Sequence, residues 1–165
     1  MIMEEDKEIV VGMGDMKTAR GKEVLATYAL GSCIGLCIYD NVTKVGGLLH
    51  AMLPEARNKN YSTNPYRYVD TGVEELLKAM CARGANMRRM KAKLVGGAKM
   101  FHFKTTVDED HIGARNVNRV HEILSEQKIP IEWEVTGGEV SRTIRFLPET
   151  GKVTIITPNH MEEII

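Results

Sequence analysis

The chain has 165 residues, a length that suits one domain with a self-sufficient hydrophobic core. Apolar residues make up 43% and charged residues 27%, a balance that excludes a disordered or fibrous protein. Lysine plus arginine and aspartate plus glutamate each number 22, which argues against a nucleic-acid-binding protein. No apolar run is long enough to cross a membrane, and the acidic N-terminal residues do not resemble a signal peptide.

No linker, repeat or low-complexity tract divides the sequence. We therefore expect a single domain over residues 1–165, with peripheral tails at 1–7 and 159–165. Only three cysteines are present, and this small, odd number does not suit a disulfide framework. Reduced thiols and a cytoplasmic location are the natural expectation.

Short apolar segments bounded by glycine or turn residues are expected to form β-strands. They lie at 9–13, 24–29, 34–39, 45–52, 91–95, 131–135, 143–147 and 153–157. Apolar residues at helical spacing predict one helix from about Val69 to Gly84, with Leu76 in its buried stripe. A second helix is predicted from about Ile112 and must end before Pro130. The expected fold class is α+β, with about eight or more strands and two main helices packed on the outside.

A predicted hairpin contains Cys33 and His50, the pair with the clearest chemical potential. We expect its turn at 40–43 with Asn41 and Val42 as loop residues, because Asp and Asn side chains stabilise turns. This turn would place Cys33 directly opposite His50, with Cβ atoms about 5 Å apart on one face. A slip of one residue would move His50 to the other face, unless a bulge restored it.

A cysteine beside a histidine can act as a nucleophile, because an imidazolium lowers the thiol pKa and protonates the leaving group. Gly31 and Ser32 precede Cys33, and this small-residue turn can expose the thiol and free backbone N–H groups for an oxyanion. Thr27 is the nearest upstream hydroxyl that could orient His50. On the residue pattern alone, an inert core residue is the more common role for such a cysteine.

Other chemically suggestive features favour simpler interpretations. Cys37 is expected to be a packing residue and Cys81 to lie in the core. The remaining histidines lack metal-site spacing, so neither a metal nor a cofactor is expected. The glycine-rich stretch 95–99 forms either a structural turn, the favoured interpretation, or part of an active-site rim. Asn116 either binds something polar or serves to begin the second helix.

Short sequence blocks, each weak alone, occur in a specific order from about residue 9 to residue 157. They are LGSCIG at 30–35, GGLLHAMLP at 46–54, YVDT at 68–71, GGAKMF at 96–101, IGARNV at 112–117 and TGG at 136–138. As an ordered set, these blocks resemble the CheD family of chemoreceptor glutamine deamidases.

The resemblance implies that Cys33 is the nucleophile, His50 the base and acid, and Thr27 the residue that positions His50. Gly31 and Ser32 would give backbone support to the oxyanion. The implied fold is a strand-rich α/β sandwich like the catalytic domain of the cytotoxic necrotizing factor toxins.

The implied reaction converts glutamines of methyl-accepting chemotaxis receptors to glutamate through a thioester, releases ammonia and needs no cofactor. The alternative is a binding module that regulates a CheC-like phosphatase of phosphorylated CheY. The expected partners are therefore the cytoplasmic helices of the receptors and that phosphatase, without nucleic acid or membrane insertion.

Overall fold

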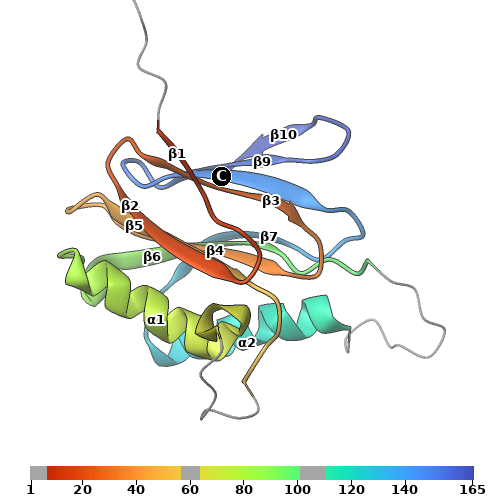
Figure 1. Cartoon of the computed structure of the whole chain (residues 1–165), viewed down its shortest axis with the longest axis horizontal. Coiled ribbons are helices and arrows are strands. Elements are labelled where there is room, and N and C mark those ends of the chain that lie inside the picture. Colours follow the sequence, from red (N-terminus) through yellow and green to blue (C-terminus); the bar gives the residue numbers. More distant parts are fainter. Residues whose placement is uncertain (1–6, 57–63, 101–110) are drawn as a thin grey trace, which may run out of the picture.

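The structure is a computed structural model that describes residues 7–56, 64–100 and 111–165. In these residues, ten strands form two stacked five-stranded sheets, and two α-helices cover one outer face (Figure 1). This arrangement confirms the expected α+β fold with its helices outside a strand-rich centre. Phe101, the last residue of one family-like block, lies outside the described residues, as do residues 1–6 of the expected N-terminal tail.

The first sheet, sheet A, has the strand order β1, β3, β8, β9 and β10. These strands are β1 (Glu8–Val10), β3 (Val24–Leu30), β8 (Arg142–Leu147), β9 (Lys152–Ile156) and β10 (Glu162–Ile164). The pair β1 and β3 is parallel, and the other neighbours are antiparallel. The segment 159–165, expected as a peripheral tail, therefore contributes an edge strand.

The second sheet, sheet B, has the strand order β2, β5, β4, β6 and β7. These strands are β2 (Asp15–Arg20), β5 (Val45–Ala51), β4 (Ile34–Asp40), β6 (Met90–Gly96) and β7 (Ile131–Thr136). Only the β6–β7 pair is parallel among these described strands. The central strand β4 is buried along its whole length, which accounts for its nearly continuous apolar sequence.

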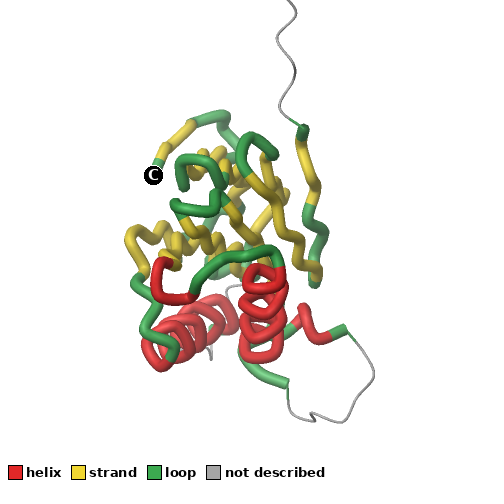
Figure 2. The backbone as a smooth tube through the Cα atoms, turned by 90° about the vertical axis from the view of Figure 1, so that its left-hand side faces the viewer, coloured by secondary structure: helices red, strands yellow, loops and turns green. Residues whose placement is uncertain are grey.

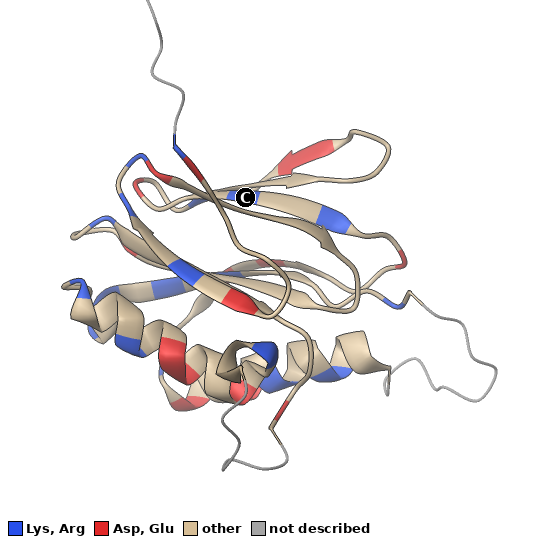
Figure 3. Ribbon diagram, viewed as in Figure 1, with Lys and Arg blue, Asp and Glu red and all other residues tan. Residues whose placement is uncertain are grey.

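Both α-helices, α1 (Val69–Ala82) and α2 (Ile112–Glu126), lie on the outer face of sheet B (Figures 1 and 2). Two short 3₁₀ helices, η1 (Pro65–Arg67) and η2 (Met87–Arg89), flank α1 along the chain. Acidic and basic residues intermingle along α1 and α2 (Figure 3), in agreement with the balanced composition.

Two hydrophobic cores occupy the two spaces between these layers. Ile34, Leu36 and Ile38 of β4 point toward the helices and join the core between sheet B and α1 and α2. Cys33 and Cys37 point the other way, into the core between the two sheets. Alternation along β4 thus decides which side chains reach the space between the sheets.

The β4–β5 turn is longer than the sequence analysis predicted. Asp40 pairs with Val45, so the loop comprises residues 41–44, and Gly35 instead of Cys33 lies opposite His50. The predicted register is therefore wrong by two residues. Because side chains alternate with a period of two, this shift leaves Cys33 and His50 on the same face.

The Asp40 carboxylate explains the longer turn. It accepts hydrogen bonds from the Val42 N–H at 3.0 Å and the Asn86 N–H at 2.9 Å. Arg89 adds a bidentate ion pair, in which its Nε lies 2.9 Å from Oδ1 and its Nη2 lies 2.8 Å from Oδ2. Asp40 is thus fixed at the end of β4 by groups from the segment that follows α1.

Candidate active site

Thr27, Cys33 and His50 lie at one end of the space between the two sheets. Cys33 stands in the bend before β4, His50 is on β5 of the same sheet, and Thr27 reaches over from β3 of sheet A. All three are buried, with exposed fractions of 0%, 9% and 2% for Thr27, Cys33 and His50. The three residues that the sequence nominated therefore face the same compartment.

Cys33 and His50 are diagonal neighbours on adjacent strands. His50 pairs with Gly35, and Cys33 lies two residues before Gly35. Diagonal neighbours in regular sheets lie about 7–8 Å apart, with somewhat shorter Cβ separations. No hydrogen bond joins the two side chains, and the His50 Nε2 atom has no partner among the described residues. Cys33 and His50 thus lie on one face without a hydrogen bond between them, and such bonds often form only when substrate binds.

Thr27 fixes the orientation of the His50 ring and the position of its proton. The Thr27 Oγ1 atom lies 2.7 Å from His50 Nδ1 and donates a hydrogen bond of 2.7 Å to the Val11 carbonyl oxygen. A hydroxyl has one proton, and Val11 receives it. Thr27 must therefore accept from an Nδ1–H, and the lone pair of the neutral ring resides on Nε2.

Burial of His50 keeps the Nε2 lone pair unprotonated. Burial lowers the pKa of His50 to about 4, so the imidazole is neutral near neutral pH. Nε2 is buried and unpaired, an arrangement that costs free energy unless a donor is supplied. A thiol proton or a bound water would be such a donor.

The Cys33 thiol is also neutral in the free protein. Burial raises its pKa, and the smaller, lowering effect of its own backbone N–H does not cancel that rise. The thiolate–imidazolium pair suggested by the sequence is therefore not the resting form. A neutral thiol can act as a nucleophile only if a base takes up its proton.

The glycine-rich stretch after β6 holds the Cys33 bend in place. The Gly97 N–H donates to the Cys33 carbonyl at 2.9 Å, and the Ala98 N–H donates to the Gly31 carbonyl at 2.9 Å. Gly96 and Gly97 have positive φ angles of 115° and 65°, which favour glycine. A side chain at Gly96 would also collide with the Cys33 carbonyl oxygen. The stretch is thus a structural turn, the interpretation that the sequence favoured, and it also borders the Cys33 bend.

Two backbone N–H groups flank the thiol. Within the described part of the chain, neither the Ser32 nor the Cys33 N–H donates a backbone hydrogen bond to another residue. Such amides can stabilise the oxygen of a tetrahedral intermediate. Gly31 serves a different purpose, because its carbonyl anchors the bend to Ala98.

A bulge in β3 directs the chain from Thr27 to the Cys33 bend. The register between β3 and β8 shifts between Thr27 and Leu30, and Ala29 adopts a left-handed φ of 55°. Bulges bend a strand and re-aim its side chains. Here the bulge follows directly after the residue that positions His50.

Asn116 was left between two interpretations by the sequence, and the structure gives it a structural link to the site. Its buried side chain donates to the Ser32 carbonyl and to the Met52 carbonyl, each at 3.0 Å. The sequence signal for this link is that Asn116 is a polar residue on the buried face of the helix, which it shares with Gly113 and Val120.

The other two cysteines have different surroundings. Cys37 is fully buried between the sheets, and burial strongly raises its thiol pKa, in agreement with a packing role. Cys81 is exposed on α1, so the expectation that it lies in the core is wrong. It directly follows the buried Met80, and one helical residue is about 100° of rotation, enough to leave the apolar stripe.

Within the described ranges, no three His, Cys, Asp or Glu side chains are grouped to hold a metal ion. Likewise, no described helix is both long and apolar enough to span a membrane.

Comparison with known proteins places the chain in a family. A family model described as CheD chemotactic sensory transduction matches residues 52–157. A Pyrococcus abyssi protein named "Probable chemoreceptor glutamine deamidase CheD" is 48% identical over 147 residues, covering 89% of this chain and 90% of that protein. The chain belongs to the CheD family. A CheD relative from Caldanaerobacter subterraneus subsp. tengcongensis, with the same printed name, is 42% identical over 156 residues, covering 94% and 96%.

Among solved structures, a Neisseria meningitidis protein of the family model DUF152 aligns with a TM-score of 0.51 at 12% identity. The alignment covers 81% of this chain and 64% of that protein, and at such identity it shows the fold alone. The CheD family match itself begins at Met52, after Thr27, Cys33 and His50. The family-model match therefore does not include these three residues.

Proposed function

We propose that this chain, as a single domain over residues 1–165, is a protein-glutamine deamidase. It converts selected glutamines on the cytoplasmic helices of methyl-accepting chemotaxis receptors to glutamate and thereby acts in chemotaxis adaptation within the cytoplasm. The observation that carries the proposal is the Thr27-oriented His50, whose buried Nε2 is unpaired and whose strand faces the same compartment as the Cys33 thiol. The printed names of the relatives support the choice of substrate.

In the first half-reaction, Cys33 Sγ attacks the side-chain carbonyl carbon of the substrate glutamine while His50 Nε2 takes the thiol proton. The N–H groups of Ser32 and Cys33 stabilise the oxyanion that forms. The carbon–nitrogen bond then breaks as Nε2–H protonates the leaving nitrogen. Ammonia departs and leaves a thioester on Cys33.

In the second half-reaction, water replaces ammonia. His50 Nε2 removes a proton from water, whose oxygen attacks the thioester carbon at the same oxyanion site. The carbon–sulfur bond breaks, the proton on Nε2 returns to sulfur, and the glutamate product leaves. Thr27 holds the ring throughout and exchanges no proton with the substrate.

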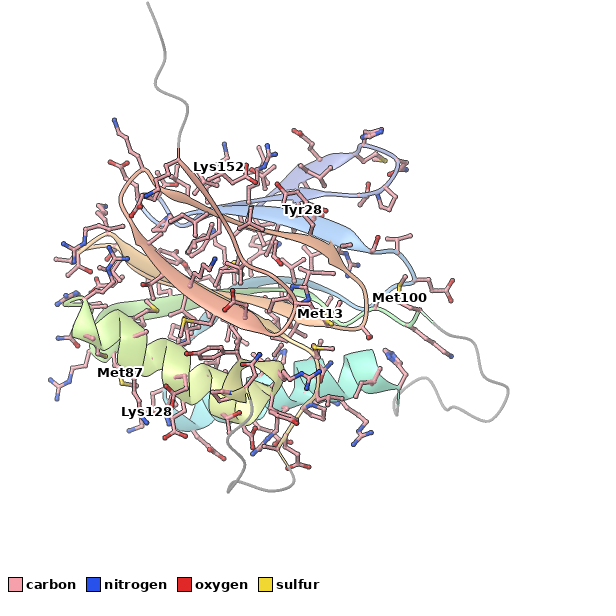
Figure 4. The ribbon with its side chains drawn as sticks, in the orientation of Figure 1. Met13, Tyr28, Met87, Met100, Lys128 and Lys152 are labelled. Carbon is pink, nitrogen blue, oxygen red and sulfur yellow. The ribbon has the colours of Figure 1, made fainter. Side chains whose placement is uncertain are left out.

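Exposed apolar side chains near the site support a protein substrate. Met13 directly precedes Gly14, whose N–H donates to the His50 carbonyl at 2.9 Å, and the Met100 side chain packs over Gly31. Both methionines are exposed and lie at the same end of the sandwich (Figure 4). Flexible methionines suit an apolar face of a partner helix.

The direct test is to incubate the protein with purified receptor and to analyse receptor peptides by mass spectrometry. We expect selected glutamines to gain the mass difference between an amide and a carboxylic acid, and to incorporate heavy oxygen from labelled water. Cys33→Ala is the matched control and should give neither change. Receptor that stays unmodified under conditions in which it binds the wild-type protein would contradict the proposal.

The end of the sandwich that carries Met13 and Met100 also suits a second role. We propose that a CheC-like phosphatase of phosphorylated CheY binds the same end of the sandwich, because the exposed methionines there can accept a helix from a second protein as well. Competition between receptor and phosphatase for Cys33→Ala protein would support a shared surface. Simultaneous binding of both partners would contradict it.

A further inference from the structure

The β4–β5 ladder includes His50 and ends just before Cys33. Its last pair in that direction is Ile34 with Ala51. Beyond it, the chain segments containing Ser32 and Met52 continue without ladder hydrogen bonds to each other. Cys33 therefore sits at the open end of the hairpin, where the ladder no longer fixes its separation from the strand of His50.

Asn116 closes this open end from α2. Its Nδ2 atom lies 3.0 Å from the Ser32 carbonyl oxygen and 3.0 Å from the Met52 carbonyl oxygen. Ser32 directly precedes Cys33, and Met52 is two residues after His50. A single side-chain nitrogen thus holds both segments, one beside the nucleophile and one beside the base.

The NH₂ group and the Oδ1 atom of Asn116 cannot exchange places. Carbonyl oxygens only accept hydrogen bonds, so the NH₂ group must face both of them and uses both of its protons. The Oδ1 atom is then left buried without a partner among the described residues, an arrangement that opposes stability. The amide is therefore best explained by the two bonds that its nitrogen makes.

The other contacts described above each hold one side of this opening. Gly97 and Ala98 bind the Cys33 bend from the β6 side, and their N–H groups do not reach β5. Thr27 holds the ring of His50 and not the Cys33 bend. Asn116 reaches both segments, and so it links the Cys33 bend to the strand of His50.

We propose that Asn116 is a positioning residue that sets the approach of the Cys33 thiol to His50 Nε2. The inference rests on the proposed function, because it concerns the same catalytic pair. It predicts that loss of the two amide hydrogen bonds lowers turnover while the receptor still binds.

Two variants test this role on the full chain. Asn116→Leu removes both donors with little change of volume, and Asn116→Asp keeps the shape while its ionised form has no donor. Misplacement of reacting groups by about 1 Å costs on the order of 10²-fold in rate, so we expect kcat to fall by about that factor with little change in KM. Asn118→Leu, at an exposed position on the same helix, should behave as wild type.

A double-mutant cycle on Cys33 alkylation gives a readout that a structural role would not produce. The rate of iodoacetamide reaction at Cys33 is followed by peptide mass spectrometry near neutral pH, which separates it from Cys81. His50→Ala should slow this reaction in the wild type, because the base is lost. In the Asn116→Leu background, His50→Ala should slow alkylation little further, because the Cys33 thiol and His50 Nε2 are already misaligned.

The outcomes separate the two claims. The positioning role is overturned if the effects of His50→Ala and Asn116→Leu on the alkylation rate simply multiply. It is also overturned if folded Asn116 variants keep the wild-type kcat. In either case the deamidase proposal stands. If His50→Ala changes neither alkylation nor turnover, the catalytic pair itself is wrong and the inference fails with it. Should Asn116→Leu not fold, Asn116→Asp carries the same measurements.

Discussion

At the scale of single residues, one hydroxyl proton determines the chemistry of His50. Thr27 gives its proton to the Val11 carbonyl and so can only accept from the ring. That choice puts the lone pair of the neutral imidazole on Nε2, which is buried and has no partner among the described residues. A residue of the same shape without the hydroxyl would leave the tautomer undetermined.

Thr27→Val tests this role, because valine has the shape of threonine and lacks its hydroxyl. We expect kcat to fall by about 10²-fold, within the range that a well-placed general base contributes. KM should change little, since Thr27 is fully buried. Thr27→Ser restores the hydroxyl and should restore most of the rate. A serine variant as slow as the valine variant would point to packing instead.

The pH dependence follows from the lowered pKa of His50. Its folded value is about 4, so the ring stays neutral, and competent as a base, from about pH 5 upward. Burial raises the pKa of the Cys33 thiol, so the reactive combination of neutral ring and neutral thiol persists through pH 8.

We therefore expect kcat/KM for a fixed receptor to be nearly flat between about pH 5 and pH 8. A histidine at its ordinary pKa of about 6.5 would instead lose roughly tenfold in rate by pH 5.5. Circular dichroism at each pH checks that the protein stays folded. An acid limb centred near the ordinary histidine pKa would show that His50 is more solvated than the structure indicates.

The three cysteines separate by their surroundings. Cys33→Ala should abolish deamidation and leave the thermal unfolding temperature close to that of the wild type. Cys37→Ala and Cys81→Ala should both retain activity, because one thiol is enclosed in the core and the other is exposed on α1. Activity that survived in Cys33→Ala and disappeared in Cys37→Ala would reverse the assignment of the nucleophile.

At the scale of elements, the hairpin shows what a sequence pattern can determine. The alternation of side chains placed Cys33 and His50 on one face, and that is correct. The turn was misplaced because Asp40 is fixed by Asn86 and Arg89, which lie 46 and 49 residues away in the sequence. Local turn preferences carry no information about such distant partners.

The helix α1 was located from its periodicity, and its packing is testable. Leu76 is fully buried against sheet B, so Leu76→Ala should lower the free energy of unfolding by about 2–5 kcal/mol. Chemical denaturation measures this value. Lys78→Ala, on the exposed side of the same helix, should change stability by no more than about 0.5 kcal/mol. A small effect at Leu76 would place the buried stripe of α1 elsewhere.

At the scale of the whole molecule, the site is assembled from both sheets and a helix. Thr27 comes from sheet A, Cys33 and His50 come from sheet B, and Asn116 comes from α2. The sequence nominated the first three by residue type and family resemblance. It gave Asn116 no clear role, because its two carbonyl partners meet only when α2 is packed on sheet B.

The two strands that the sequence analysis missed, β2 and β10, are edge strands. Their segments are rich in polar and charged residues, and β10 is exposed along its length. Edge strands bury little apolar surface, so they leave a weak periodic signal. The central strands, which form the compartment around Cys33 and His50, bury apolar side chains along their length and were located correctly.

The arrangement of exposed methionines leads to a prediction about substrate binding. Met13 is 63% exposed beside the strand of His50, and Met100 is 39% exposed over the bend that carries Cys33. Burial of one methionine side chain stabilises a complex by roughly 1.5–3 kcal/mol, which is tenfold or more in affinity. Met13→Asp should therefore raise KM for the receptor by about tenfold, because the apolar contact is replaced by a charge that must stay hydrated.

The kcat of Met13→Asp at saturating receptor should remain near the wild-type value, because Met13 touches none of the reacting groups. Val42→Asp is the matched control, since Val42 is 66% exposed in the turn at the opposite end of the β4–β5 hairpin. That variant should leave both KM and kcat unchanged. Equal increases in KM for Met13→Asp and Val42→Asp would mean that the receptor responds to added charge anywhere on the surface. An unchanged KM in Met13→Asp would place the docked helix on another side of the Cys33 bend, with Met100→Asp as the next variant to measure.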